Sequence, residues 1–212
     1  DRGEPHIQFG PQRLMDKPAP VAELDRLQAL STEGQARPRL ELIRERGTIR
    51  VGYFSDTLPF AFRNDQNRVV GFDMEIIHQL AKDLDLKIEL AHLTSPDNES
   101  RLLADGSLDI TVGGRTITPT RALSVAFSQP YTQHTAAFIV KDNRRDLFAS
   151  MDDIREMESL NLAMIANPYY EKMVRDLFPN TRVTPIDTPR QYFKGQYKDV
   201  DALVFSAETG AA

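Results

Sequence analysis

The stretch LDITVGGRTITPTRALSVAFSQPY, residues 108–131, joins an apolar run to a turn and the turn to the start of a helix. The apolar run at 108–112 is typical of a buried strand, and Gly113-Gly114 gives the backbone freedom to turn sharply after it. Thr118 is a good N-cap residue, and the proline after it suits the first position of a helix. The stretch therefore predicts a strand, a loop and a helix near 119–124, a unit from which α/β folds are built.

Arg121 falls in the first turn of this helix, where a cation is unfavourable. The exposed N–H groups and the helix dipole make that end positive, so a guanidinium there costs roughly a few tenths of a kcal/mol unless an anion lies opposite. A carboxylate would match the guanidinium in two hydrogen bonds, with Gly113-Gly114 allowing close approach and Thr116 offering a hydroxyl. Two interpretations stay open from these residues: a clamp for a ligand carboxylate, or a surface ion pair with a carboxylate of the protein.

The composition excludes several classes of protein. The 212 residues carry a net charge of -5, and no run of Lys and Arg is coupled to aromatics, so we expect no nucleic acid partner. No apolar run approaches the roughly 18 residues that span a bilayer. Cysteine is absent, which excludes disulfides and cysteine nucleophiles. Because the chain starts at Asp1 without methionine or an apolar leader, we expect a mature or excised piece of a longer gene product.

Residues 1–44 are expected to form an N-terminal arm with short helices ahead of the main domain. Residues 1–19 mix proline, glycine and charge, which is typical of an extended segment. The apolar residues of 21–30 recur every three positions, which predicts a short helix with a narrow apolar stripe. A second helix is indicated by the leucines and isoleucine of 40–43, with Gly47 placed to end it in a left-handed cap.

From Thr48 onward, strand patterns alternate with helix patterns. Strands are predicted at 48–53, 87–93, 108–112, 134–141, 161–166, 181–186 and 200–205, and helices at 72–85, 98–105, 119–124, 151–158, 168–178 and 188–195. This order predicts an α/β fold with mostly parallel, doubly wound sheets. A polar stretch after Lys141 is a candidate boundary between lobe 1 at 45–141 and lobe 2 at 142–212. We expect the second lobe to be incomplete in this chain, because the chain stops just after a strand.

Aromatic residues follow two of the predicted strands. Phe54 and Phe60 come after the first core strand, at the same end of the sheet as Gly113, and Tyr169 follows the strand that ends at Ala166. Such residues suit the apolar wall of a ligand pocket, and they equally suit plain core packing.

Motifs that carry catalysis are missing. The four histidines are scattered, the acidic pairs are typical of solvated turns, and neither a P-loop nor a nucleophile elbow is present. We expect no enzymatic activity, no metal and no cofactor.

Three runs of the sequence carry a resemblance to a known family: LELIRERGTIRVGYFSDTLPFAF (40–62), GFDMEIIHQLAKDL (71–84) and LLADGSLDITVGGRTITPTRALSVAFSQPY (102–131). They resemble the family 3 extracellular solute-binding proteins, the type 2 periplasmic binding proteins that serve amino-acid ABC transporters. The resemblance covers residues 40 to about 206. It implies a two-lobed α/β fold whose hinge strands let the lobes close around a small ligand.

The resemblance also implies roles for single residues. Arg121 matches the arginine that grips the α-carboxylate of the ligand, Thr116 matches a hydroxyl residue beside it, and Gly114 matches the position whose carbonyl accepts from the α-amino group. In the second lobe, Tyr169 matches a residue that reaches the carboxylate. Ser206 stands where the family has an aspartate for the α-amino group, and this departure favours an organic acid or an atypical amino acid.

The resulting expectation is a periplasmic receptor that captures a small carboxylate-bearing solute and presents it to the permease of a membrane transporter. One alternative is a ligand-sensing domain of a larger membrane protein, in which a fused membrane domain replaces the permease. A second alternative is a dehydratase of cyclic carboxylates, since such enzymes share this fold. It needs a general acid in the cleft, for which only Glu171 and Glu208 lie nearby in the sequence.

Overall fold

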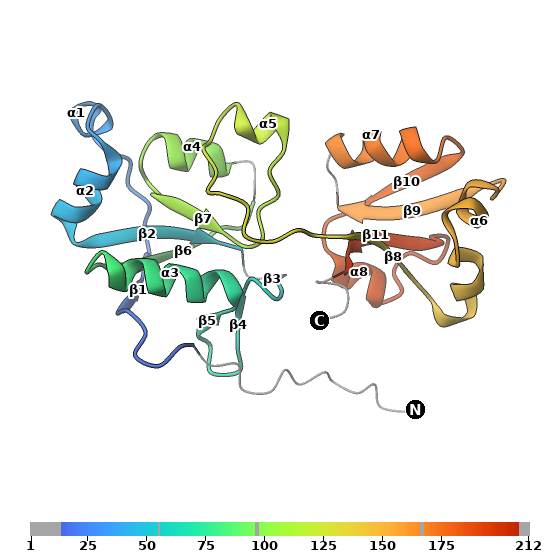
Figure 1. The fold of residues 1–212 in the computed structure, drawn as a ribbon, viewed down its shortest axis with the longest axis horizontal. Coiled ribbons are helices and arrows are strands. Elements are labelled where there is room, and N and C mark those ends of the chain that lie inside the picture. Colours follow the sequence, from blue (N-terminus) through green and yellow to red (C-terminus); the bar gives the residue numbers. More distant parts are fainter. Residues whose placement is uncertain (1–13, 55, 96–97, 166–167, 208–212) are drawn as a thin grey trace. The chain divides into compact units, whose positions relative to one another are not determined.

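The computed structural model describes residues 14–54, 56–95, 98–165 and 168–207. The chain forms two compact units, residues 1–129 and 130–212 (Figure 1). Each unit has its own sheet and its own buried cluster of apolar residues.

The first unit is built on a parallel four-stranded sheet with the order β1-β6-β2-β7. Its strands are β1 (Val21–Glu23), β2 (Thr48–Tyr53), β6 (Lys87–His92) and β7 (Ile110–Val112). Tyr53, the last residue of β2, is paired with Val112, the last residue of β7. Phe54 and Gly113 therefore leave the sheet side by side at its carboxyl edge, as the sequence predicts.

The helices of the first unit are α1 (Thr32–Gln35), α2 (Arg39–Arg46), α3 (Phe72–Asp83), α4 (Glu99–Ala104) and α5 (Pro119–Ala122). In α3, Met74, Ile77 and Ala81 recur at helical spacing and are all at most 2% exposed, so this face packs into the core. Gly47 ends α2 with a φ of 70°, which confirms the predicted left-handed cap.

A small antiparallel sheet, β3-β4-β5, accompanies the main sheet of the first unit and is absent from the sequence-based prediction. It consists of β3 (Asp56–Thr57), β4 (Ala61–Arg63) and β5 (Val69–Val70). Strands of two or three residues are too short to show an alternating pattern, so only tertiary pairing identifies them.

The predicted helix over 21–30 is wrong. Residues 21–23 instead form β1 on the open edge of β6, and the chain then continues without helix, with Leu24 and Leu27 packed against the buried cluster around Leu93 and Leu108. A three-residue repeat puts side chains on one side of an extended threefold chain as well as of a helix. Edge pairing supplies backbone partners here, whereas a lone short helix is marginal in water. Residues 1–13 of the predicted arm lie outside the described residues.

The second unit has a mixed sheet with the order β10-β9-β11-β8. Its strands are β8 (Ala136–Val140), β9 (Leu160–Ile165), β10 (Thr181–Ile186) and β11 (Ala202–Ser206). Its helices are η2 (Asp142–Phe148), α6 (Met151–Arg155), α7 (Pro168–Leu177) and α8 (Pro189–Phe193). Strand β8 pairs antiparallel with β11 along its whole length, so the units separate between 129 and 130 rather than at the predicted 141/142.

Candidate functional site

The loop after β7 carries the arginine that the sequence singles out. The Thr118 hydroxyl accepts a hydrogen bond from the backbone N–H of Arg121 at 3.3 Å, so the predicted N-cap of α5 is confirmed. The guanidinium of Arg121 turns back along the loop, where Nη1 donates to the carbonyl oxygen of Thr116 at 3.0 Å. Arg121 is half-buried and Thr116 is exposed. The loop therefore holds the guanidinium against the residue whose hydroxyl was predicted to join it in binding.

Asp73, which no sequence pattern indicated, holds the two glycines of this loop in place through its carboxylate. One carboxylate oxygen of Asp73 accepts the backbone N–H of Gly113 and that of Gly114, both at 2.8 Å. Asp73 is 2% exposed. Two successive N–H groups converging on one oxygen form an anion-binding nest, and here the protein's own carboxylate fills it. An aspartate in the first turn of a helix is ordinary dipole compensation, so the sequence carries no signal for this role.

The two glycines are also required sterically. Their φ values are 119° at Gly113 and 61° at Gly114, a region that favours glycine. A Cβ added at Gly114 would lie 2.6 Å from Cδ2 of Phe60, and one at Gly113 would lie 2.8 Å from Oγ1 of Thr57. Phe60 is only 6% exposed, so its ring backs the loop from the core side and offers little surface to a ligand.

Phe54, a second predicted wall residue, is half-buried and has a cation over its ring. The guanidinium carbon of Arg115 lies 4.7 Å from the ring centroid. Arg115 is itself bound to Glu99, in the first turn of α4, through Nε at 3.0 Å and through Nη2. Thr111 donates its hydroxyl to the same carboxylate at 2.7 Å. Phe54 therefore belongs to a polar and aromatic assembly beside the loop.

The remaining predicted residues belong to the second unit. Tyr169 lies in the first turn of α7, and its side chain, like residues 166–167, falls outside the described part of the chain. Ser206 is the last residue of β11 and is paired with Ala136 of β8. In the first unit, the structure brings together four of the predicted residues: Arg121, Thr116, Gly114 and Phe60. Phe54 follows β2 at the same edge of the sheet, beside Gly113.

Within the described part of the chain, the histidine and acidic side chains lack the grouping that metal binding requires. Among the described residues, no group of three or more His, Asp or Glu side chains is placed to hold a metal ion. His78 is fully buried in α3, and neither ring nitrogen has a hydrogen-bond partner there. Burial lowers the pKa of His78, so the ring is held neutral. His92 packs against Tyr53 in a tilted arrangement, with ring centroids 5.4 Å apart.

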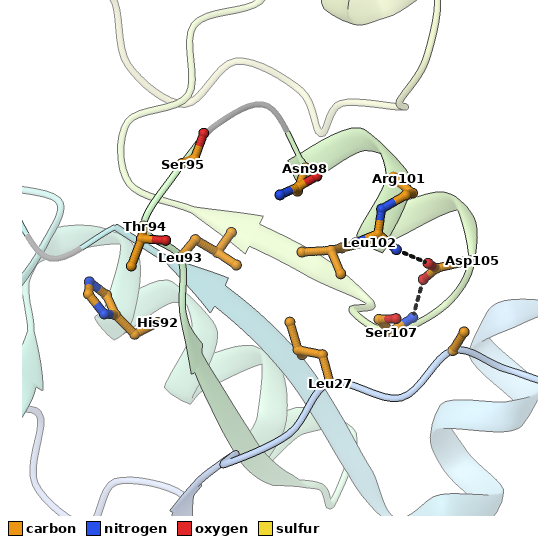
Figure 2. A pocket seen from close by; sticks show the side chains of 11 residues that line it. Leu27, His92, Leu93, Thr94, Ser95, Asn98, Arg101, Leu102, Asp105 and Ser107 are labelled. Atoms are coloured by element: carbon orange, nitrogen blue, oxygen red, sulfur yellow. Dashed lines mark hydrogen bonds and ion pairs between the residues drawn. The ribbon is translucent and has the colours of Figure 1, made fainter. Parts of the chain in front are cut away.

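A cavity of about 420 Å³ lies beside α4 and is lined in part by Leu27 and Ala29 of the N-terminal segment (Figure 2). Figure 2 shows Arg101 and Ser107 beside Asp105. Nη1 of Arg101 and the backbone N–H of Ser107 each donate a hydrogen bond of 2.9 Å to the Asp105 carboxylate. Burial alone would raise the pKa of Asp105, but hydrogen bonds from Ser107 and the charge of Arg101 bring it below its ordinary value. None of the predicted site residues lines this cavity.

Within the described ranges, no helix combines the length and the apolar character needed to cross a bilayer.

Residues 49–200 match the profile of the bacterial extracellular solute-binding proteins, family 3. The L-cystine-binding protein TcyJ of Escherichia coli K12 is 28% identical over 166 residues, which cover 78% of this chain and 61% of that relative. The cyclohexadienyl dehydratase of Pseudomonas aeruginosa is 29% identical over 130 residues, covering 61% of this chain and 47% of the enzyme. The chain therefore spans less than two thirds of the length of these curated relatives.

Among solved structures, the ancestral amino acid-binding protein AncCDT-1, a precursor of cyclohexadienyl dehydratase, matches with a TM-score of 0.72 and 29% sequence identity. The match covers 82% of this chain and 76% of that chain. It confirms the predicted α/β class and the type 2 periplasmic-binding fold.

Proposed function

The chain belongs to the bacterial extracellular solute-binding proteins, family 3, and we propose that it captures a small carboxylate-bearing solute. The solute is an amino acid or an organic acid, bound outside the cytoplasm. In the periplasm, the loaded protein presents the solute to the permease of a membrane transporter. The relatives named for cystine and amino-acid binding support this reading.

The observation that carries the proposal is the arrangement of the loop from Gly113 to Arg121. Asp73 occupies the N–H groups of both glycines, so a ligand carboxylate must be met by side chains and by the start of α5. Arg121 lies in the single turn of α5, with its guanidinium at the carbonyl of Thr116. A carboxylate between this guanidinium and the Thr116 hydroxyl would accept hydrogen bonds from both and pair with the cation.

Ser206 of the second unit is the proposed contact for the end of the ligand opposite its carboxylate. Ser206 offers a hydroxyl at the end of β11 and no negative charge. A hydroxyl binds an ammonium far less strongly than a carboxylate does, because no charge pair forms. This favours an organic acid or an atypical amino acid, and calorimetry with standard amino acids, monocarboxylates and dicarboxylates tests it. Tight binding of a standard α-amino acid alone would contradict the organic-acid reading and leave the capture function intact.

Arg121→Ala is the direct test of the clamp. Losing a charge-assisted pair with the ligand should weaken binding by about 2 kcal/mol or more, measured by calorimetry with the best ligand of the panel. Arg68→Ala, at an exposed position of the same unit, is the matched control and should bind like the unchanged protein. Equal affinity in the Arg121 and Arg68 variants would remove the clamp.

The alternative function is enzymatic turnover, because one relative of this chain is a cyclohexadienyl dehydratase. Of the two acids that such a reaction could use here, Glu171 lies in the first turn of α7 and Glu208 lies outside the described residues. We infer binding without turnover from the absence of a catalytic motif in the sequence. Incubation with a prephenate-like acid, followed by product absorbance, tests this inference, and catalytic release of an aromatic product would overturn it.

A further inference from the structure

The loop that holds Arg121 contains a second arginine, Arg115, between Gly114 and Thr116. Arg115 and Arg121 lie on the same loop, and the guanidinium carbon of Arg115 lies 4.7 Å from the ring centroid of Phe54, a predicted wall residue of the ligand pocket. Two positive charges at this place would favour a ligand with two negative charges at its bound end, since like charges at short range both attract an anion. Whether the charge of Arg115 is paired within the protein therefore decides whether a ligand meets one positive charge or two.

Glu99 pairs directly with that charge. Its carboxylate accepts two donors of Arg115, Nε at 3.0 Å and Nη2, in a side-by-side pair. Only 19% of the Arg115 side chain and 10% of the Glu99 side chain are exposed, so water screens the pair weakly. Thr111 orients the carboxylate with a hydrogen bond of 2.7 Å.

Phe54 fixes the guanidinium from its other side. The ring lies 4.7 Å from the guanidinium carbon, a distance at which a cation over an aromatic face is attracted to it. Phe54 packs in turn on the buried cluster that contains Leu93 and Leu108. Arg115 is thus held by a carboxylate and a ring, both anchored in the core of the first unit.

We propose that Glu99 is a specificity-determining residue, which cancels the charge of Arg115 so that the loop acts toward a ligand as a single cation. The inference rests on the proposed capture of a carboxylate ligand. It predicts that the site prefers a ligand with one negative charge at the bound end over a dianion of the same shape. Glu99 does this without contacting the ligand, through the charge and position of Arg115.

The test is Glu99→Gln, which keeps the shape of the side chain and removes its charge. The affinity ratio of a dicarboxylate to its monoamide is measured by calorimetry at low salt, with malonate against malonamate, because both carboxylates of malonate are attached to one carbon and lie at the same end. We expect the ratio to rise on the order of tenfold, since an uncompensated cation near the ligand adds attraction of that size. Glu99→Gln combined with Arg115→Gln should return the ratio to its original value. Glu89→Gln, which breaks the comparable pair of Glu89 with Arg50 in the same unit, should leave it unchanged.

Arg115→Met is a second variant, for the case that Glu99→Gln does not fold, and it should change the affinity ratio in the opposite direction. It leaves the Glu99 charge uncompensated, so the ratio should fall below that of the unchanged protein. An unchanged ratio in the folded variants, or a shift that the double substitution does not reverse, overturns the inference.

Inorganic phosphate separates this inference from the proposed function. Glu99→Gln should bind phosphate several-fold more tightly than the unchanged protein, and Arg115→Gln should reverse the gain, whether or not any organic acid binds. Failure of the unchanged protein to bind any carboxylate of the panel contradicts the proposed function alone. No gain in phosphate affinity on Glu99→Gln contradicts the role of Glu99 alone.

Discussion

At the scale of single residues, the shape of the binding loop depends on Asp73, a buried side chain placed below it. Asp73→Leu leaves the N–H groups of Gly113 and Gly114 without their acceptor, and we expect the free energy of unfolding to fall by about 2 kcal/mol or more, with weaker ligand binding. Asp73→Asn keeps one oxygen acceptor and should recover most of both losses, measured by urea unfolding and calorimetry. Asp83→Leu, at the exposed far end of α3, is the control and should change neither quantity appreciably. If Asp73→Asn were as damaging as Asp73→Leu, the hydrogen bonds would not explain the role of this residue.

At the scale of elements, the N-terminal segment is part of the first unit, although the family match begins only at residue 49. Strand β1 completes one edge of the sheet, and Leu27 packs against the cluster below it. Leu27→Asp should lower the free energy of unfolding by about 2 kcal/mol, because it removes apolar burial and places a charge there. Gln28→Asp introduces the same side chain at the exposed next position and should change it by less than about 0.5 kcal/mol. A change in urea unfolding as small for Leu27→Asp as that expected for Gln28→Asp would show that the packing of this segment does not contribute to folding stability.

The sequence predicts the elements that have long local patterns and does not predict the contacts between distant residues. Strand β2 at 48–53 and helix α3 are predicted closely because their apolar patterns are long and local. The N-cap at Thr118 is equally local. The contacts of Asp73 with the loop and of Glu99 with Arg115 join residues that are distant in sequence and have ordinary local patterns, so no periodicity indicates them. Strand β1 is missed for the same reason, since only the open edge of β6 makes its conformation favourable.

At the scale of the whole molecule, the proposed ligand residues are divided between the two units, with Arg121 in the first and Ser206 in the second. A ligand that contacts both favours whichever arrangement of the units makes both sets of contacts. The chain has no cysteine, so Gln28→Cys and Lys198→Cys, both exposed, give two dye sites, one in each unit. We expect energy transfer between the dyes to change on addition of the best ligand of the panel, and to stay constant when Arg121→Ala is added at the same ligand concentration. Gln28→Cys with Gln66→Cys, two exposed positions of the first unit, is the control and should report no change. A saturating ligand that leaves the transfer between residues 28 and 198 unchanged would show that capture does not alter the arrangement of the units.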